Sequence, residues 1–423
     1  MRRPLLAALA VLLALWMGRS IVGCASASAP AATPPASVAE AGTLVLVSID
    51  GMRWDYLDRP GAEIPTLRQI AGGVQAERLI PVFPTLTFPN HYSLVTGLHP
   101  ETHGIVGNTM RDPGRLIDGE AARFSLSDRD AQRDPAWWSG EPIWVTAERQ
   151  GLRAATVFWP GSEAETAVRP SRWLPYDGSL PYAARVDSAL AWLDAPDPPG
   201  LITLYFEAVD SAGHEHGPDA PDVDQALARV DAALARLFDG LRQRGRLAST
   251  DLVVVSDHGM RARSRDRVVI LDDAIDLDAH DVDWGATVGV WPAPGTDLDA
   301  LVDRISALDH VTAYRKDDAP ARLHYRDNPR IPPVTILADD GWTATSREYL
   351  DRNPDRPSGG THGWDNRFDS MHGVFLASGP HFRDGLRTGP VQTVDVYGIV
   401  ASALGLDPAP NAGDPAAARR VLR

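Results

Sequence analysis

The sequence predicts an α/β protein with a mostly parallel central sheet flanked by helices. Three short runs carry this prediction, and they span residues 44–49, 201–206 and 252–255. Each run consists almost entirely of aliphatic, β-branched or aromatic residues, a composition typical of strands buried on both faces of a parallel sheet. Acidic residues follow all three runs, so the sequence also predicts carboxylates along one edge of the sheet.

These acidic residues are accompanied by histidines. Asp50 follows the first run, Asp210 and His214 follow the second, and Asp257 and His258 follow the third. The carboxyl ends of parallel strands meet in a crevice, and open α/β sheets bind their ligands there. One such pair could equally be a polar strand end, because Gly259 makes a turn directly after His258. The recurrence of the arrangement favours a metal site.

A glycine-rich loop at residues 359–365 adds His362, because close backbone packing at glycines can bring an imidazole to the same crevice. The six candidate ligands are then three carboxylates and three imidazoles, without a thiolate. This mixture suits Zn²⁺ or a similar first-row metal better than Ca²⁺ or Mg²⁺. Six ligands are too many for one open tetrahedral ion, so we expect two Zn²⁺ per chain.

The first 24 residues have the form of a lipoprotein-type signal peptide. Two arginines precede an apolar run from Leu5 to Met17, which is short for a membrane span. Residues 21–24 resemble a lipobox, with Cys24, the only cysteine, as the residue to be acylated. Ordinary cleavage among the small residues after Cys24 is the alternative. We expect an exported, periplasmic protein with a lipid anchor in a bacterial membrane, and no internal disulfide.

The domain organisation follows from composition. Residues 25–42 are rich in Ala, Ser and Pro and should form a flexible tether. Residues 43–423 should form one catalytic domain with a small α/β lobe inserted at about 276–355. Within the lobe, the pattern predicts a strand at 285–290, a helix at 298–308 and a strand at 334–337. Residues 111–142 are predicted to be a long surface excursion.

The formal net charge of −15 argues against binding to duplex nucleic acid or to an anionic membrane through a basic surface. Metal ions could still make the site attractive to phosphate. The sequence does not specify an oligomeric state.

Thr87 opens a second informative stretch, Thr-Phe-Pro-Asn-His. As the N-cap of a helix, with Pro89 tolerated in the first turn, its hydroxyl would lie where backbone N–H groups favour an anion. That location suits a nucleophile attacking phosphate, although a capping role alone explains the stretch more simply. Asn108 could donate a hydrogen bond to a phosphoryl oxygen, but Gly-Asn is also a common turn.

Together these residues resemble the nucleotide pyrophosphatase/phosphodiesterase family of the alkaline phosphatase superfamily. Six motifs occur in order: Asp50-Gly, Thr87 to His91, His103 to Asn108, Asp210 with residues 213–218, residues 256–260 and residues 361–366. The resemblance implies an alkaline-phosphatase-like fold. It covers the chain from about residue 44 to the C-terminus, without the cysteine-rich and nuclease-like domains of animal relatives.

The resemblance also implies roles for individual residues. Thr87 would be the nucleophile and would pass through a covalent phospho-threonine intermediate. Asn108 and the backbone N–H of Phe88 would stabilise the phosphoryl oxygens. One zinc would be held by Asp210, His214 and His362, and the other by Asp50, Asp257 and His258 together with Thr87.

The expected reaction is hydrolysis of nucleotide phosphodiester and pyrophosphate bonds, with release of nucleoside monophosphates. Phe88 and Tyr205 could stack a nucleobase between them, with Tyr176 as a third wall. Both of the first two could instead be core aromatics. Alternative functions are a diesterase for phospholipid headgroups, another diesterase or monoesterase with the same metals, and a metal-binding lipoprotein without turnover.

Overall fold

The computed structural model describes residues 42–353 and 355–423. The signal peptide expected at residues 1–24, and the tether apart from its last residue, lie outside this part of the chain. In the part that is described, no helix combines the length and the apolar character needed to cross a membrane.

The central sheet has eight strands in the order β19-β2-β18-β9-β1-β8-β6-β7. Five adjacent strands, β9, β1, β8, β6 and β7, pair in parallel with one another. Strand β18 is antiparallel to both of its neighbours, β9 and β2. The predicted α/β fold with a mostly parallel sheet is therefore confirmed. The strands are β1 (Thr43–Ile49), β2 (Val74–Ala76), β6 (Ala154–Val157), β7 (Arg172–Leu174), β8 (Leu201–Phe206), β9 (Thr250–Val255), β18 (Phe375–Ser378) and β19 (Leu386–Thr388).

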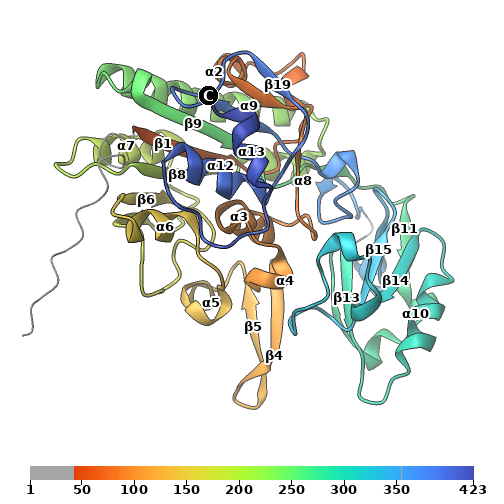
Figure 1. Cartoon of the computed structure of the whole chain (residues 1–423). Coiled ribbons are helices and arrows are strands. Elements are labelled where there is room, and N and C mark those ends of the chain that lie inside the picture. The colour runs from red at the N-terminus through yellow and green to blue at the C-terminus, as the bar shows by residue number, and fades with distance from the viewer. Residues whose placement is uncertain (1–41, 354) are drawn as a thin grey trace, which may run out of the picture. The chain divides into compact units, whose positions relative to one another are not determined.

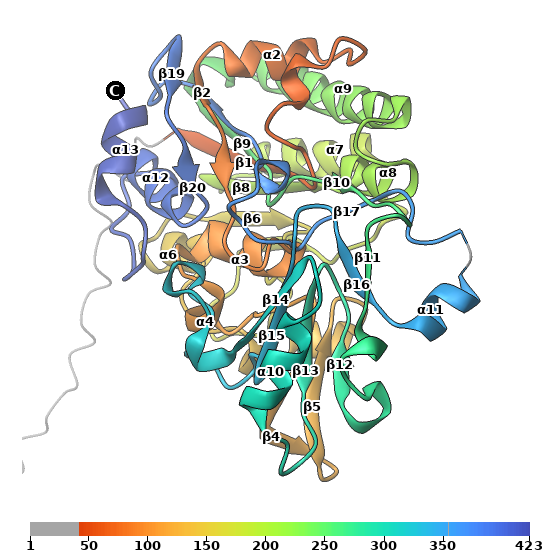
Figure 2. The same cartoon turned by 90° about the vertical axis from the view of Figure 1, so that its right-hand side faces the viewer.

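Two hydrophobic cores cover the two faces of this sheet. On β1, Val45 and Val47 pack into one core, whereas Leu44 and Leu46 pack into the other, because successive strand side chains point to opposite faces. The first core is closed by α2 (Pro65–Ala71), α7 (Tyr182–Leu193), α8 (Ala208–His216) and α9 (Pro221–Gln243), and the second by α3 (Thr87–Thr96), α6 (Ile143–Arg149), α12 (Asp395–Ala403) and α13 (Pro415–Val421). Figure 1 and Figure 2 together show α7 and α9 on the side of the strands opposite α12 and α13.

A second, antiparallel sheet with the order β12-β13-β15-β14 occupies the region where the sequence predicted a lobe. Helix α10 shares a hydrophobic core with this sheet, and Figure 2 shows the helix beside the strands of the sheet. The predicted helix at 298–308 ends at residue 306, and the strand predicted at 285–290 begins only at Thr287. Strands β12 and β14 were not predicted. The elements are β12 (Asp281–Asp283), β13 (Thr287–Trp291), α10 (Leu298–Ser306), β14 (Val311–Arg315) and β15 (Val334–Ala338).

The predicted surface excursion at 111–142 is partly confirmed, because most of these residues are exposed or half-buried, but the segment has regular structure and a buried part. Residues in this segment form a hairpin of β4 (Thr109–Ile117) and β5 (Glu120–Ser125), followed by α5 (Arg129–Arg133). Trp137 and Trp138 are buried, 2% and 6% exposed, because they pack with Phe124 into the core below Phe88. The charged residues around these aromatics concealed the core contribution in the sequence.

Shorter elements connect these layers. They are β3 (Leu79–Ile80), α4 (Pro100–His103), β10 (Arg261–Ala262), β11 (Val268–Ile270), β16 (Thr343–Thr345), α11 (Arg347–Arg352), β17 (Gly360–Thr361) and β20 (Val391–Gln392).

Candidate active site

The six predicted ligands lie at the carboxyl ends of the parallel strands. Asp50 directly follows β1, and Asp257 and His258 begin two residues after β9. Asp210 lies in the first turn of α8 rather than in a loop, because the chain turns into this helix directly after Glu207. His214 is one turn further along α8, so its side chain lies on the same helix face as Asp210.

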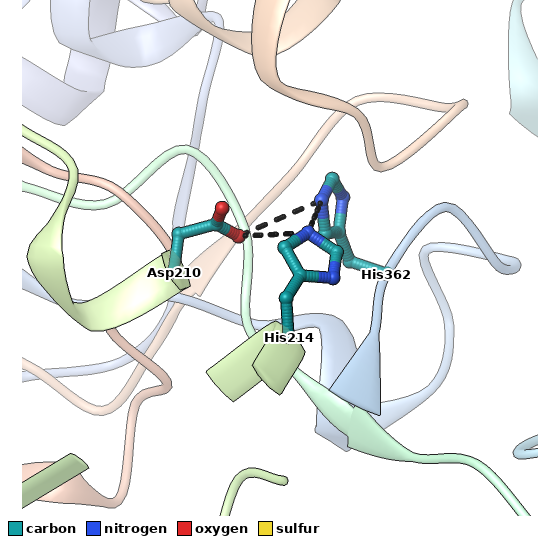
Figure 3. Close-up of side chains that lie close together, drawn as sticks. All are labelled: Asp210, His214 and His362. Atoms are coloured by element: carbon teal, nitrogen blue, oxygen red, sulfur yellow. Dashed lines mark hydrogen bonds and ion pairs between the residues drawn. The ribbon is translucent and has the colours of Figure 1, made fainter. Parts of the chain in front are cut away.

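Asp210, His214 and His362 point toward one another, as Figure 3 shows. Oδ1 of Asp210 lies 3.4 Å from Nε2 of His214 and 3.6 Å from Nε2 of His362. The two Nε2 atoms are 3.2 Å apart. One ligand atom from each of these residues can therefore surround a single ion.

The backbone fixes which ring nitrogen each histidine presents. Nδ1 of His214 lies 3.0 Å from the carbonyl oxygen of Gly360, and Nδ1 of His362 lies 2.9 Å from that of Thr85. A carbonyl oxygen can only accept, so each Nδ1 carries the proton and each neutral ring presents a bare Nε2. Burial and the neighbouring His258 and His214 hold the pKa of His362 well below its usual value, which keeps it neutral. Two nitrogen lone pairs that face each other at this distance repel, and a cation between them would remove the repulsion.

The second group of ligands surrounds His258. Its Nε2 lies 3.4 Å from Oδ1 of Asp50 and 3.0 Å from Oδ2 of Asp257. Its Nδ1 is 2.9 Å from the carbonyl oxygen of Gly259, so this ring also presents a bare Nε2 when neutral. The ring stacks on that of His362, with centroids 3.5 Å apart, so the two groups of ligands are adjacent.

Three buried carboxylate oxygens test whether these residues fit metal ions. Oδ1 of Asp50, Oδ1 of Asp210 and Oδ2 of Asp257 have no hydrogen-bond partner among the described residues. Leaving a buried carboxylate oxygen without a partner is costly, and coordination of a cation removes that cost. All three oxygens face the imidazole nitrogens described above. The donor set of carboxylates and imidazoles therefore fits a pair of first-row metal ions.

The electrostatics of the carboxylates agree with this interpretation. Burial, followed by the nearby Asp257 and Asp210, raises the pKa of Asp50 well above its usual value. Burial alone would also raise the pKa of Asp257, but His258 and His91 hold that pKa well below its usual value. Carboxylates this close to one another repel when ionised, and bound cations would relieve the repulsion.

His91 lies near the same carboxylates, and Asp50, His91 and Asp257 form a further group close enough to hold an ion. Both nitrogens of His91 already have partners, however. Its Nδ1 lies 2.9 Å from the carbonyl oxygen of Thr87, and its Nε2 lies 2.8 Å from the hydroxyl of Ser48, which can donate to it. We therefore favour His258 as the imidazole ligand for this group.

Thr87 is the first residue of α3 and not its N-cap, which is Leu86. The predicted capping role is therefore wrong, because the Thr87 side chain makes no capping bond. Its hydroxyl oxygen instead lies 3.3 Å from Nε2 of His258. The hydroxyl thus lies at a helix N-terminus, beside the candidate ligands.

Asn108 and Phe88 are joined directly. The backbone N–H of Phe88 donates to Oδ1 of Asn108, with a nitrogen–oxygen distance of 2.9 Å. Because Oδ1 of Asn108 accepts this bond, the NH₂ group is the donor that this amide still has to offer. The N–H of Phe88 is occupied here, so Asn108 is the donor available for a phosphoryl oxygen.

A cavity of about 300 Å³ opens beside Thr87, and its lining includes Phe88, Asn108, Tyr176 and Tyr205. The three predicted aromatic residues thus meet in one cavity, but with unequal exposure. Tyr205 is only 8% exposed and its hydroxyl is bound to Asp50, whereas Tyr176 is 37% exposed. Phe88 is half-buried and packs on Phe124 and Trp138.

Sequence reasoning missed several residues that line this cavity. Glu207 is held by Arg185 through two hydrogen bonds of 2.6 and 2.8 Å. Arg129 is bound by Glu163 and by the carbonyl oxygen of Tyr176. Glu207 could have been found, since it precedes Asp210 by one helical turn. Arg129, Glu163 and Arg185 lie in segments without a motif, so only the fold brings them to the site.

The parallel sheet and the Asp/His groups at its carboxyl edge define an alkaline-phosphatase-like hydrolase fold. Residues 44–365 match the family model described as type I phosphodiesterase / nucleotide pyrophosphatase, and the chain belongs to that family. The family predicted from the sequence motifs is therefore confirmed.

Known relatives support the same family assignment. The chain is 37% identical over 403 residues to venom phosphodiesterase CdcPDE of Crotalus durissus collilineatus, covering 91% of this chain and 47% of the relative. It is 37% identical to ectonucleotide pyrophosphatase/phosphodiesterase family member 1 of Rattus norvegicus, covering 88% and 42%. The chain thus spans about half the length of the curated relatives it matches.

Among solved structures, murine ectonucleotide pyrophosphatase/phosphodiesterase 5 superposes with a TM-score of 0.83 at 34% identity, covering 90% of this chain and 100% of that one. An inactive variant of the same murine protein in complex with AMP gives a TM-score of 0.82.

Proposed function

We propose that this protein is a two-zinc phosphodiesterase that hydrolyses nucleotide phosphodiester and pyrophosphate bonds and releases nucleoside monophosphates. One observation carries the proposal. Three imidazoles direct their Nε2 atoms at three carboxylate oxygens that have no hydrogen-bond partner, next to the hydroxyl of Thr87. The complex of the murine relative with AMP supports a nucleotide as substrate.

In the proposed site, Asp210, His214 and His362 would hold one zinc, and Asp50, Asp257 and His258 would hold the other, with Thr87 beside the second group. When bound, the two ions supply positive charge that lowers the pKa of a hydroxyl and stabilises the negative oxygens of the reacting phosphate.

The residues of the chain perform the remaining tasks. The hydroxyl oxygen of Thr87 loses its proton and attacks phosphorus in line, and the bond to the leaving oxygen breaks as the bond to Thr87 forms, so that the leaving oxygen takes up a proton and departs as an alcohol. The NH₂ group of Asn108 holds a non-bridging phosphoryl oxygen, and the first turn of α3 adds its positive dipole end. Water then hydrolyses the phospho-threonine ester and regenerates the hydroxyl of Thr87.

The cavity beside Thr87 supports a diester with a nucleoside substituent. Phe88 and Tyr176 offer aromatic surface for a base, and Tyr205 forms the floor between them and Asp50. A phosphate monoester carries a further negative charge that needs a further cation. Arg129 is the one Arg or Lys among the described lining residues, and Glu163 already pairs with it. The organic substituent of a diester therefore fits this side better.

The test is kcat/KM for p-nitrophenyl thymidine monophosphate against p-nitrophenyl phosphate, measured on zinc-loaded protein. We expect wild type to prefer the diester, and Phe88→Ala combined with Tyr176→Ala to lower that preference by about tenfold or more. Tyr349→Ala is the matched control, because this exposed tyrosine lies outside the cavity. A preference for the monoester, or for a phosphocholine ester added to the panel, would contradict the nucleotide assignment.

We also propose that the protein is exported to the periplasm and anchored by lipid at Cys24, on the basis of the lipobox-like residues 21–24. Cys24→Ala should move the protein from the membrane fraction to the soluble fraction. An unchanged distribution between the two fractions would contradict lipid anchoring.

A further inference from the structure

A second cavity of about 460 Å³ lies against the same catalytic residues. Asn108, His214 and His362 line both this cavity and the nucleoside cavity. A groove therefore continues across the candidate metal ligands. A diester bound with its nucleoside in the first cavity would direct its leaving group into the second.

Trp284 is the main aromatic feature of this second cavity. It lies in the connection between β12 and β13 and is 49% exposed, which is unusual for so large an apolar side chain. The first residue of β13, directly after this connection, is anchored to the loop that carries His362, because the hydroxyl of Thr287 donates to the carbonyl oxygen of Gly363 over 2.6 Å. The indole is thus presented from a segment whose position relative to the site is fixed.

The same cavity offers no cation for a polyphosphate. Arg330 is the one Arg or Lys among its described lining residues. Its Nε donates to Asp112, its Nη1 to the carbonyl oxygens of Gly104 and Trp137, and its Nη2 to that of Ala136. The other charged group besides the candidate ligands is the carboxylate of Asp283, which is paired with Arg111 and also offers no positive charge to a phosphate.

We propose that this cavity binds an uncharged nucleoside leaving group stacked on Trp284, and that the protein therefore prefers dinucleoside monophosphates to nucleoside triphosphates. This inference rests on the proposed diesterase function and adds the identity of its leaving group. With a triphosphate, attack by Thr87 at the α-phosphorus would send pyrophosphate into a cavity with no available cation. With a dinucleoside monophosphate, the leaving group is a 3′-hydroxyl on a neutral sugar and base.

The experiment compares thymidylyl-thymidine with thymidine triphosphate. Wild type should favour the dinucleoside in kcat/KM. Trp284→Ala should lower kcat/KM for the dinucleoside by about tenfold, the scale of one stacked base, with little effect on the triphosphate. Trp284→Phe should restore most of the loss, and Trp284→Lys should lower activity on the dinucleoside while raising it on the triphosphate.

Two controls separate this inference from the proposed function. Tyr349→Ala removes an aromatic residue of similar exposure that lines neither the nucleoside cavity nor this second cavity, and it should change neither substrate. Inhibition by thymidine 5′-monophosphate, which fills the first cavity and the site, should be the same in wild type and in the Trp284 variants.

Binding gives a second readout that does not require turnover. Metal-loaded Thr87→Ala should bind the dinucleoside more tightly than the triphosphate in calorimetry, and adding Trp284→Ala should remove that difference. The inference is overturned if wild type favours the triphosphate, or if Trp284→Ala weakens both substrates equally. Absence of turnover on every diester would contradict the proposed function, and the binding comparison would still decide the leaving group.

Discussion

The hydroxyl of Tyr205 donates a hydrogen bond to Oδ2 of Asp50 over 2.6 Å. Its ring is almost fully buried and packs edge-on against His91. The other oxygen of Asp50 is the one without a hydrogen-bond partner. Tyr205 therefore fixes which oxygen of Asp50 is directed at the ligand cluster, a role different from the stacking wall that the sequence suggested.

This relationship predicts the behaviour of Tyr205→Phe. Loss of the hydroxyl leaves Oδ2 of Asp50 without its donor, so the carboxylate is held less firmly. We expect zinc affinity or kcat to fall by about 10- to 100-fold, the usual effect of removing a partner of a metal ligand. Competition with a chelator measures the affinity. Tyr182→Phe is the control, and an unchanged metal affinity and kcat in Tyr205→Phe would contradict this role.

Metal content gives a second prediction. Purified, zinc-loaded protein should contain two Zn²⁺ per chain, lose activity with a strong chelator and recover it when Zn²⁺ is restored. His214→Ala should retain one ion, because this residue belongs only to the group with Asp210 and His362. Elemental analysis showing one ion or none in fully active wild type would refute the two-ion site.

The sequence predicted β1, β8 and β9, which are three of the eight strands of the central sheet, and the six candidate ligands, because each depends on a local pattern. The shorter strands β2, β6, β7, β18 and β19 were not predicted. A buried strand is a run of apolar residues, and Asp50 and Asp257 follow such runs within two residues. The sequence did not predict the features that depend on tertiary packing. The sequence placed Trp137 and Trp138 in a surface segment, whereas in the fold Phe124 and Phe88 pack on them. Arg185 lies on α7, 22 residues before Glu207, and no local pattern links the two, so their bond has no signature in the sequence.

The stability of the protein should depend on the protonation of His103. Burial, with a smaller effect of His99, lowers the pKa of His103 from 6.5 to about 3. Its Nδ1 accepts from the N–H of Ile105 and so must be unprotonated, and its Nε2 bonds the hydroxyl of Ser93.

The pKa of His103 is lower in the folded than in the unfolded protein, so its contribution to stability is fully present above pH 6.5. This contribution is lost as the pH falls from 6.5 toward 3. At pH 5 the loss is about 2 kcal/mol, because the unfolded chain binds the proton and the folded chain does not. Urea unfolding at pH 7 and pH 5 measures it. Between pH 7 and pH 5 the free energy of unfolding should fall less in His103→Gln than in wild type. An equal fall in the two proteins would contradict the prediction.

The last prediction concerns the nucleophile. Thr87→Ala should lower kcat by several orders of magnitude, because no other described hydroxyl lies both at the N-terminus of α3 and beside His258. The zinc content should stay at two per chain, since the carboxylates and imidazoles remain. Thr87→Ser keeps the attacking oxygen and should retain a substantial part of the activity. Rapid acid quenching of wild type with a slow diester should trap a phosphorylated peptide that contains Thr87. Near-normal kcat in Thr87→Ala, or a label on a different residue, would show that the reaction does not proceed through this threonine.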